Sequence, residues 1–267
     1  MLSDEELKSY QQDGQINSPV SLSSEMMQTI KKKMTLLFNN NPELDQDYAP
    51  DLFKYDKSWL DIAKAPEILD IVAQLIGDDI ICWGSAFFAK RGFGGKATPW
   101  HQDGQYWPIE PLETCTAWIA VDKATEENGC LKVIPGSHIS RKHFEHFRDD
   151  STEIVLNQAL NLAALPFKEP RNVILEPGMF SIHDAFMIHG AEANNSGKQR
   201  SGLTFRYMPA TSYFNRAKAK KMTKDLSLEL TLVYQTLPKE IHRMLLQLKM
   251  ESLECLLTYM TLIHLKN

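Results

Sequence analysis

The chain has 267 residues, of which 43% are hydrophobic and 24% charged, so it can bury a full core as one domain. Its net charge of -5 argues against a nucleic-acid-binding protein, because such proteins usually carry a basic face that neutralises phosphates. The four cysteines form no Cys-x-x-Cys pair, and no signal core or apolar run of about 18 residues is present, so we expect a cytoplasmic protein that does not bind membranes.

Three helices are predicted in an N-terminal part of about residues 1–78. The run Ser3-Asp4-Glu5-Glu6 is typical of a capped helix start. Apolar residues recur at spacings of three and four within 21–38, which predicts a second helix. Pro66 is a good first-turn residue for a third helix that ends near Gly77. We expect these helices to brace a sheet.

From residue 79 to about 210, short runs of strand-forming residues alternate with turn signals. The runs are 80–90, 116–121, 130–134, 173–175, 179–183 and 201–208. Many short strands without alternating long helices indicate an antiparallel sandwich or jelly roll. The less regular segment 139–170 interrupts them, and we expect it to form a long insertion or a lid.

Helical spacing returns in the C-terminal part, about 211–267. We expect its apolar face to cover the barrel or to form a dimer seam, which makes the protein a monomer or a homodimer. The predicted fold class is therefore mainly β with helical additions, a single domain in which a jelly-roll core of about 79–210 is braced by helices at both ends.

One polar pair stands out in the segment 99–108, which follows a glycine-rich loop. His101 and Asp103 are two residues apart, so on an extended segment their side chains point to the same side. They form half of a 2-His-1-carboxylate site for ferrous iron, which needs one more histidine. His189 is our candidate for the third ligand, and His183 is the alternative.

Three separated pieces within about 80–209 resemble the phytanoyl-CoA dioxygenase family of iron(II)- and 2-oxoglutarate-dependent oxygenases. They are the segment 99–108, the strings 116–122 and 127–138, and the segment 178–190 followed by Arg200. The resemblance implies a double-stranded β-helix of jelly-roll type, with His101, Asp103 and His189 as ligands of Fe(2+). It also implies 2-oxoglutarate as cosubstrate, O2 as oxidant and ascorbate as an optional aid.

The same resemblance assigns roles to further residues. In the family an arginine eleven residues after the distal histidine binds the far carboxylate of 2-oxoglutarate, which matches Arg200 here. Arg206 is the competing choice, because it lies on the same strand face by parity, and it could instead reach substrate. Trp118 aligns with a position beside the cosubstrate, although a core role fits it nearly as well. Asp103 favours hydroxylation, because related halogenases carry a small residue there.

The presumed pocket suggests a small polar substrate. Lys90 precedes the triad, and Gln105, Tyr106 and Trp107 follow it. Cations could hold an anionic head while aromatic faces receive an ammonium group. The chain most resembles hydroxylases of 2-aminoethylphosphonate, which act on the carbon next to phosphorus. The alternatives are an acyl-CoA, amino acid or betaine substrate and, in other classes, a non-catalytic metal-binding jelly-roll sensor, a cupin-like isomerase or a zinc hydrolase.

Overall fold

The structure is a computed structural model that describes residues 1–166, 169–216 and 218. The predicted C-terminal helical part lies outside the described residues except at its start. There, strand β14 (Tyr213–Phe214) pairs with β5 (Ile109–Glu110), so these first residues are extended rather than helical. The fold below is that of the described residues alone.

The N-terminal part is helical, as predicted. Its helices are α1 (Asp4–Asp13), α2 (Ser24–Asn40), α3 (Leu52–Tyr55), α4 (Trp59–Ala63) and α5 (Pro66–Ile76). Ser3 caps α1 with a capping box, since its hydroxyl accepts from the Glu6 amide and the Glu6 carboxylate accepts from the Ser3 amide. Helices α3 and α4 are about one turn long, too short for the apolar period to reveal them. No helix in the described ranges has the length and apolarity to cross a membrane.

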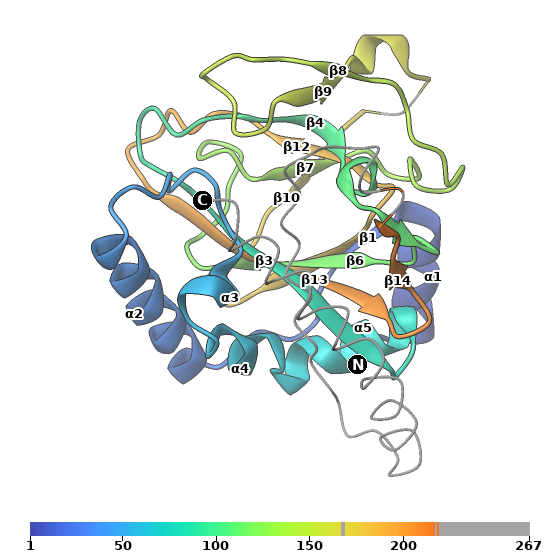
Figure 1. Cartoon of the computed structure of the whole chain (residues 1–267), viewed down its shortest axis with the longest axis horizontal. Coiled ribbons are helices and arrows are strands. Elements are labelled where there is room, and N and C mark those ends of the chain that lie inside the picture. Colours follow the sequence, from blue (N-terminus) through green and yellow to red (C-terminus); the bar gives the residue numbers. More distant parts are fainter. Residues whose placement is uncertain (167–168, 217, 219–267) are drawn as a thin grey trace. The chain divides into compact units, whose positions relative to one another are not determined.

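Two antiparallel sheets face each other, which confirms the mainly β prediction (Figure 1). The six-stranded sheet has the order β1-β11-β6-β13-β3-β2, and the four-stranded sheet has the order β10-β7-β12-β4. The bounds in the larger sheet are β1 (Gln15–Asn17), β2 (Ala49–Pro50), β3 (Ile80–Lys90), β6 (Cys115–Ala120), β11 (Phe180–Asp184) and β13 (Arg200–Pro209). Those in the smaller sheet are β4 (Thr98–Gln102), β7 (Leu131–Val133), β10 (Arg171–Val173) and β12 (Ile188–Ala191).

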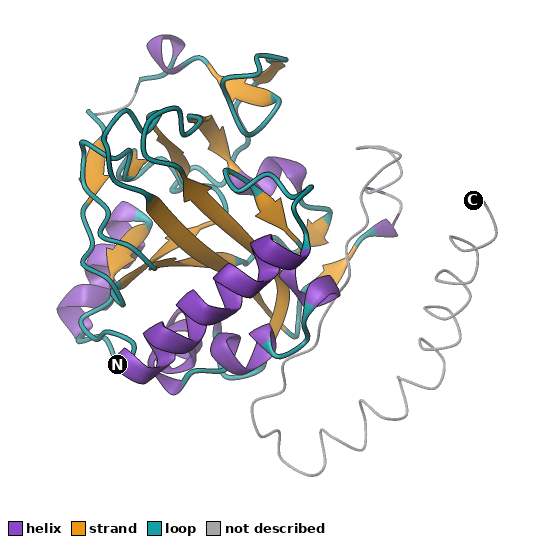
Figure 2. Cartoon of the chain, turned by 90° about the vertical axis from the view of Figure 1, so that its left-hand side faces the viewer, coloured by secondary structure: helices purple, strands orange, loops and turns teal. Residues whose placement is uncertain are grey.

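The side chains of strand β13 alternate between the two faces of the larger sheet. Leu203, Phe205 and Tyr207 are fully buried in the core cluster that includes residues of α2, α4 and α5. These helices cover one face of the larger sheet (Figures 1 and 2). The residues between them therefore face the smaller sheet, because successive side chains of a strand point to opposite sides.

A bulge in β3 changes the side to which its residues point. Arg206 of β13 lies opposite Gly84, whereas Tyr207 lies opposite Cys82, so Trp83 is the unpaired residue. A bulge of this kind re-aims a side chain. The Trp83 indole lies edge-on to Trp107, with 4.6 Å between the ring centroids.

The interrupting segment 139–170 contains a β-hairpin and a short helix. Its elements are β8 (His146–Arg148), β9 (Gln158–Leu160) and the 3-10 helix η2 (Leu162–Ala164). The Gln102 amide group donates to the carbonyl oxygens of Lys142 at 3.0 Å and Phe186 at 2.8 Å, and its side-chain oxygen accepts from the Phe144 amide. Gln102 thereby ties the insertion to the end of β4.

Strand β3 ends on a lysine that is completely buried. The Lys90 Nζ atom donates to the carbonyl oxygens of Ala191 at 3.1 Å and Glu192 at 2.6 Å. Burial, with the nearby Arg200 cation as a second cause, lowers the pKa of Lys90 to about 6. At neutral pH the side chain is therefore mainly a neutral amine, and its two N–H bonds match the two carbonyl acceptors.

We predict that Lys90→Met flattens the dependence of the unfolding free energy on pH. An unfolded lysine titrates near its ordinary pKa of about 10.4, whereas Lys90 in the folded chain titrates near about 6. Between these values the unfolded state binds more protons, so wild-type stability should rise with pH. From about pH 6.5 to about pH 9.5 the gain should exceed that of the variant by a few kcal/mol.

Urea denaturation at each pH measures this difference, with exposed Lys64→Met as the control that keeps the wild-type slope. Equal slopes for wild type and the Lys90 variant would show that the amine is charged in the folded protein.

A second prediction concerns the contact between β13 and α4. The buried Tyr207 hydroxyl donates to the carbonyl oxygen of Ala63 at 2.8 Å. Tyr207→Phe leaves this carbonyl without its donor, so we expect a loss of about 1–3 kcal/mol of unfolding free energy. Tyr213→Phe, at an exposed position, should change it by about 0.5 kcal/mol or less. Denaturant titration compares them, and similar losses would contradict this role for Tyr207.

Candidate active site

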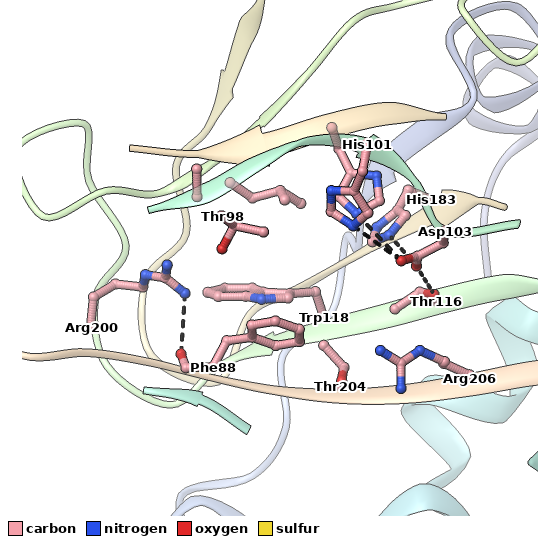
Figure 3. Close-up of a pocket in the computed structure, with 13 residues that line it drawn as sticks. Phe88, Thr98, His101, Asp103, Thr116, Trp118, His183, Arg200, Thr204 and Arg206 are labelled. Carbon is pink, nitrogen blue, oxygen red and sulfur yellow. Dashed lines mark hydrogen bonds and ion pairs between the residues drawn. The ribbon is translucent and has the colours of Figure 1, made fainter. Parts of the chain in front are cut away.

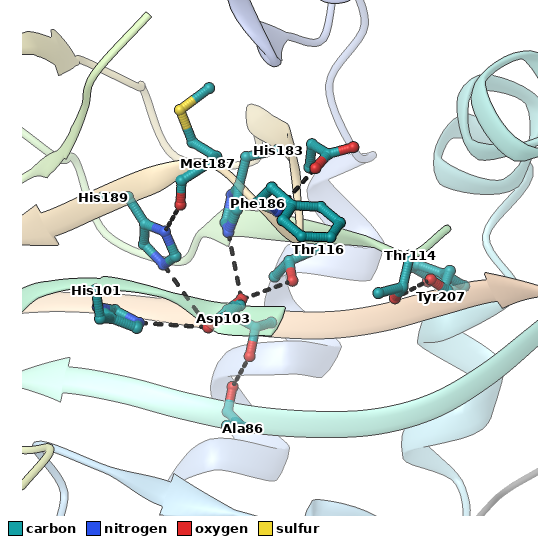
Figure 4. Close-up of polar contacts among 12 residues, drawn as sticks. Ala86, His101, Asp103, Thr114, Thr116, His183, Phe186, Met187, His189 and Tyr207 are labelled. Atoms are coloured by element: carbon teal, nitrogen blue, oxygen red, sulfur yellow. Dashed lines mark hydrogen bonds and ion pairs between the residues drawn. The ribbon is translucent and has the colours of Figure 1, made fainter. Parts of the chain in front are cut away.

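Three predicted ligands converge between the sheets. Strand β4 ends at Gln102, and Asp103 begins the 3-10 helix η1 (Asp103–Tyr106), yet His101 Nε2 and Asp103 Oδ1 lie 3.3 Å apart. His189 of β12 is the direct cross-strand partner of His101, and its Nε2 lies 3.8 Å from the same carboxylate oxygen (Figure 4). One donor atom from each residue lies within 4.8 Å of the other two, as a single metal ion requires.

Backbone carbonyls determine which ring nitrogens face the centre of this cluster. His101 Nδ1 lies 2.8 Å from the Pro99 oxygen, and His189 Nδ1 lies 3.0 Å from the Met187 oxygen. A carbonyl oxygen only accepts, so each Nδ1 carries the hydrogen, and in a neutral ring Nε2 then offers its lone pair. Two such lone pairs and a carboxylate oxygen pointing at one another repel unless a cation lies between them. The donor set therefore fits a metal ion.

The charge states suit metal binding as well. Burial, reinforced by His101 and His183, lowers the pKa of His189 well below its ordinary value, so the ring is neutral. Burial alone would raise the pKa of Asp103, but the neighbouring His189, His101 and His183 rings hold it well below its ordinary value. Thr116 Oγ1 also donates to Asp103 Oδ2 at 3.1 Å. An ionised carboxylate and a neutral imidazole are the forms that bind metals.

His183, the alternative ligand, lies on the far side of the carboxylate. Its Nε2 is 3.6 Å from Asp103 Oδ2, and its ring centroid is 4.5 Å from that of His189. The side chain is buried, and neither ring nitrogen has a hydrogen-bond partner. The cluster of converging donor atoms does not include it.

The cluster opens into a pocket of about 440 Å³ between the sheets (Figure 3). The pocket is lined by both predicted ligand histidines and Asp103, and by Phe88, Thr98, Thr116, Trp118, Leu131, His183, Ala191, Arg200, Thr204 and Arg206. Among the predicted residues, the structure thus brings together the three ligands, the two arginines and Trp118.

Arg200 lies at one end of this pocket and has unused hydrogen-bond donors. Its side chain is 2% exposed, one terminal nitrogen donates to the Phe88 oxygen at 3.2 Å, and Nε has no partner. No acidic side chain of the described part of the chain forms an ion pair with it. Burial lowers its pKa to about 10, so it remains a cation at neutral pH. A buried cation without a counterion fits the carboxylate of a bound anion such as 2-oxoglutarate.

Trp118 forms the pocket floor beside this arginine. The Arg200 guanidinium carbon lies 5.3 Å from the centroid of the indole ring. Gly202 lies directly under the ring, because a Cβ atom there would be 2.1 Å from Trp118 Cζ2. Only glycine leaves the space that this indole occupies between Arg200 and Thr204.

Arg206 lies at the other end of the same strand face. Its guanidinium carbon is 5.5 Å from the Trp107 ring centroid and 6.0 Å from that of Trp83. Burial raises the pKa of Tyr48, and the Arg206 cation opposes this rise. The parity argument that placed both arginines on one face holds because β13 is continuous from Arg200 to Arg206, and the extra residue of the bulge belongs to β3.

Four residues predicted to contact substrate do not line this pocket. Lys90 donates to the two carbonyls described above, and Trp107 packs on Trp83 beneath Arg206. Gln105 and Tyr106 belong to η1, and the Tyr106 hydroxyl donates to the Gln158 oxygen at 3.4 Å. All four were expected near the site from their position beside the ligands in the sequence, and the chain turns into the 3-10 helix η1 at Asp103.

Several lining residues were missed by the sequence analysis. They are Phe88, Thr98, Thr116, Leu131, Ala191 and Thr204. For Thr116 and Thr204 a signal existed, because they share strand parity with Trp118 and with the two arginines, respectively. The remaining ones follow from pairing between distant strands, which no local pattern indicates.

Comparison with known proteins gives the family. The family model described as "Phytanoyl-CoA dioxygenase (PhyH)" matches residues 10–202. A probable phytanoyl-CoA dioxygenase of Caenorhabditis elegans is 32% identical over 61% of this chain and 53% of that protein. The peroxisomal phytanoyl-CoA dioxygenase of Homo sapiens is 36% identical over 61% of this chain and 49% of that protein. The chain thus spans about half the length of the curated relatives it matches.

A solved structure supports the fold independently. The non-heme alpha ketoglutarate dependent carbocyclase SnoK from nogalamycin biosynthesis aligns with a TM-score of 0.67 at 23% identity, covering 88% of this chain and 94% of that one. At this identity the likeness concerns the fold alone. Since the family model matches more than half of its residues, including all three candidate ligands, the chain belongs to the phytanoyl-CoA dioxygenase (PhyH) family.

Proposed function

We propose that this protein is an Fe(II)- and 2-oxoglutarate-dependent hydroxylase. The observation that carries the proposal is the convergence of the His101, Asp103 and His189 donor atoms within 4.8 Å, in a pocket that also contains the unpaired cation of Arg200. A metal-binding sensor, a cupin-like isomerase or a zinc hydrolase could use the same three ligands but would have no need of this arginine.

Each residue has a defined part in this proposal. Ferrous iron and 2-oxoglutarate, when bound, supply the oxidation of an unactivated C–H bond by O2, with release of succinate and carbon dioxide. The three ligands would hold the metal, and Arg200, which lies beside Trp118, would bind the far carboxylate of the cosubstrate. The carboxylate of Asp103 fills the place that related halogenases leave to chloride, which supports hydroxylation.

We propose a small polar substrate, with 2-aminoethylphosphonate, hydroxylated next to phosphorus, as the first candidate. The same pocket must hold the cosubstrate as well as the substrate, which supports a small molecule over a bulky one. An amino acid, a betaine or the acyl end of an acyl-CoA are the alternatives.

One prediction of this proposal separates the two candidate histidines. His189→Gln should weaken ferrous iron binding by on the order of 100-fold or more, because it removes a ligand. His183→Gln should weaken it by about 10-fold or less, because that ring only borders Asp103. Anaerobic equilibrium dialysis with iron measures both, with His143→Gln, at an exposed position, as the control. Equal losses at 183 and 189 would assign His183 to the metal.

Another prediction of this proposal concerns binding of the cosubstrate. Anaerobic protein with iron and 2-oxoglutarate should develop the visible charge-transfer band of an iron–oxoacid chelate. Arg200→Gln should raise the 2-oxoglutarate concentration needed for half of this band by about 10- to 100-fold, because a charge-assisted fork is lost. The exposed Arg148→Gln is the control. A metal-loaded protein that forms no band would favour the sensor, isomerase or zinc hydrolase.

Succinate formation tests the substrate. The aerobic, loaded protein should form succinate faster when 2-aminoethylphosphonate is added. If it does not, this compound is excluded, and the same assay with amino acids, betaines and acyl-CoA thioesters decides among the alternatives.

A further inference from the structure

We propose that Arg206 binds an anionic group of the substrate, a carboxylate or a phosphonate, beside the metal site. The proposal rests on the proposed function and names the substrate class for the same pocket. The pocket contains a second guanidinium, that of Arg206, at the opposite end of the β13 face from Arg200. The three metal ligands and the cosubstrate leave the positive charge of Arg206 unmatched.

The Arg206 cation is held in place without being neutralised. Two indoles, Trp83 and Trp107, pack against the guanidinium. Its Nε is buried and has no partner. None of the acidic residues that the structure describes makes an ion pair with it. Aromatic faces attract a guanidinium while leaving its in-plane N–H donors free.

The neighbouring strand packs closely against this side chain. Gly84 of β3 lies directly opposite Arg206, and a Cβ atom there would be in ordinary van der Waals contact with Arg206 Cδ, at 3.4 Å. The bulge at Trp83 then brings an indole to the same side. The surroundings thus position the guanidinium toward the pocket, as Figure 3 shows.

The register places Arg206 next to the metal ligands. It lies opposite Thr116 of β6, and Thr116 donates to Asp103 Oδ2 at 3.1 Å. Side chains directly opposite each other in antiparallel strands have Cβ atoms about 4.5–5.5 Å apart. An anion on Arg206 would therefore lie on the Asp103 side of the metal site, and the carbon exposed to oxidation would be one close to the anionic group.

Charge balance supports an anionic substrate. Apart from histidines, the ionised side chains that line the pocket in the described residues are Asp103, Arg200 and Arg206. A ferrous ion and the 2-oxoglutarate dianion cancel each other, so the loaded pocket keeps one net positive charge. Arg206 is partly buried, so an unbalanced charge there is unfavourable, and an anionic group of the substrate balances it.

The two arginines would then serve different ligands. Trp118 lies across from Thr204 and over Gly202, between the two ends of the strand face. Arg200 is the cation within reach of a ligand on its side of this indole, and Arg206 is the cation on the metal side. This separation makes the two roles testable independently.

Isothermal titration of the full chain, loaded anaerobically with iron and saturating 2-oxoglutarate, tests the proposal. The probes are 2-aminoethylphosphonate and β-alanine, which each carry an anionic group, and β-alaninamide, which keeps the ammonium group but has a neutral amide in place of the carboxylate. At least one anionic probe should bind about 10-fold or more tightly than the amide, since a charge-assisted pair forms. The phosphonate and carboxylate probes distinguish the two anion types.

Variants at the two arginines assign the contact. Arg206→Gln should weaken binding of the anionic probe by about 10- to 100-fold and leave the amide unchanged. The visible iron–oxoacid band should form at the wild-type 2-oxoglutarate concentration. Arg206→Lys, which keeps the charge without the fork, should recover part of the affinity. Arg200→Gln should shift the band but, at saturating 2-oxoglutarate, keep the affinity for the probe.

Three results would overturn the proposal: no anionic probe binds to protein that forms the band, the amide binds as tightly as the anions, or Arg206→Gln keeps full affinity. If that variant does not fold, the comparison on the wild type between probes with and without an anionic group still decides. Absence of the band in wild-type protein would instead count against the proposed function.

Discussion

The alternation of side chains along β13 is the constraint on which the interior depends. Because this strand lies in the middle of the larger sheet, both of its faces are covered. Leu203, Phe205 and Tyr207 contribute to the core beneath the helices, and the residues between them form the floor of the pocket. Stability and chemistry therefore share one strand. A slip of one residue in its register would put two guanidiniums into the hydrophobic core.

Much of this could be predicted from the sequence, because the informative patterns are local. A capping box, an apolar period and Pro66 each act within a few residues, so the three long helices could be placed from the sequence. The spacing of His101 and Asp103 and the interval from His189 to Arg200 are also short-range features of the chain. Their convergence in space follows from pairing of β4 with β12, which the resemblance to a family supplied and periodicity could not.

Four predicted substrate contacts lie outside the pocket lining for two physical reasons. Parity is a guide to the face of a strand only while the strand lasts, and the chain turns into a 3-10 helix at Asp103. Gln105, Tyr106 and Trp107 therefore follow a different period. Lys90 does point to the same side as its partner Arg200, but two carbonyls at the end of β12 accept its hydrogen bonds. Such acceptors belong to distant segments, so the sequence around Lys90 does not indicate them.

The missing side chain at Gly202 has a consequence for how such a protein can diversify. The indole of Trp118 lies in the space above it and acts as a partition along the pocket floor. Residues on the two sides of the indole can therefore change independently. Substitutions near Arg206 could change which substrate binds without disturbing the Arg200 end of the pocket. A single hydrogen atom in place of a methyl group thus gives this pocket its capacity for evolutionary change.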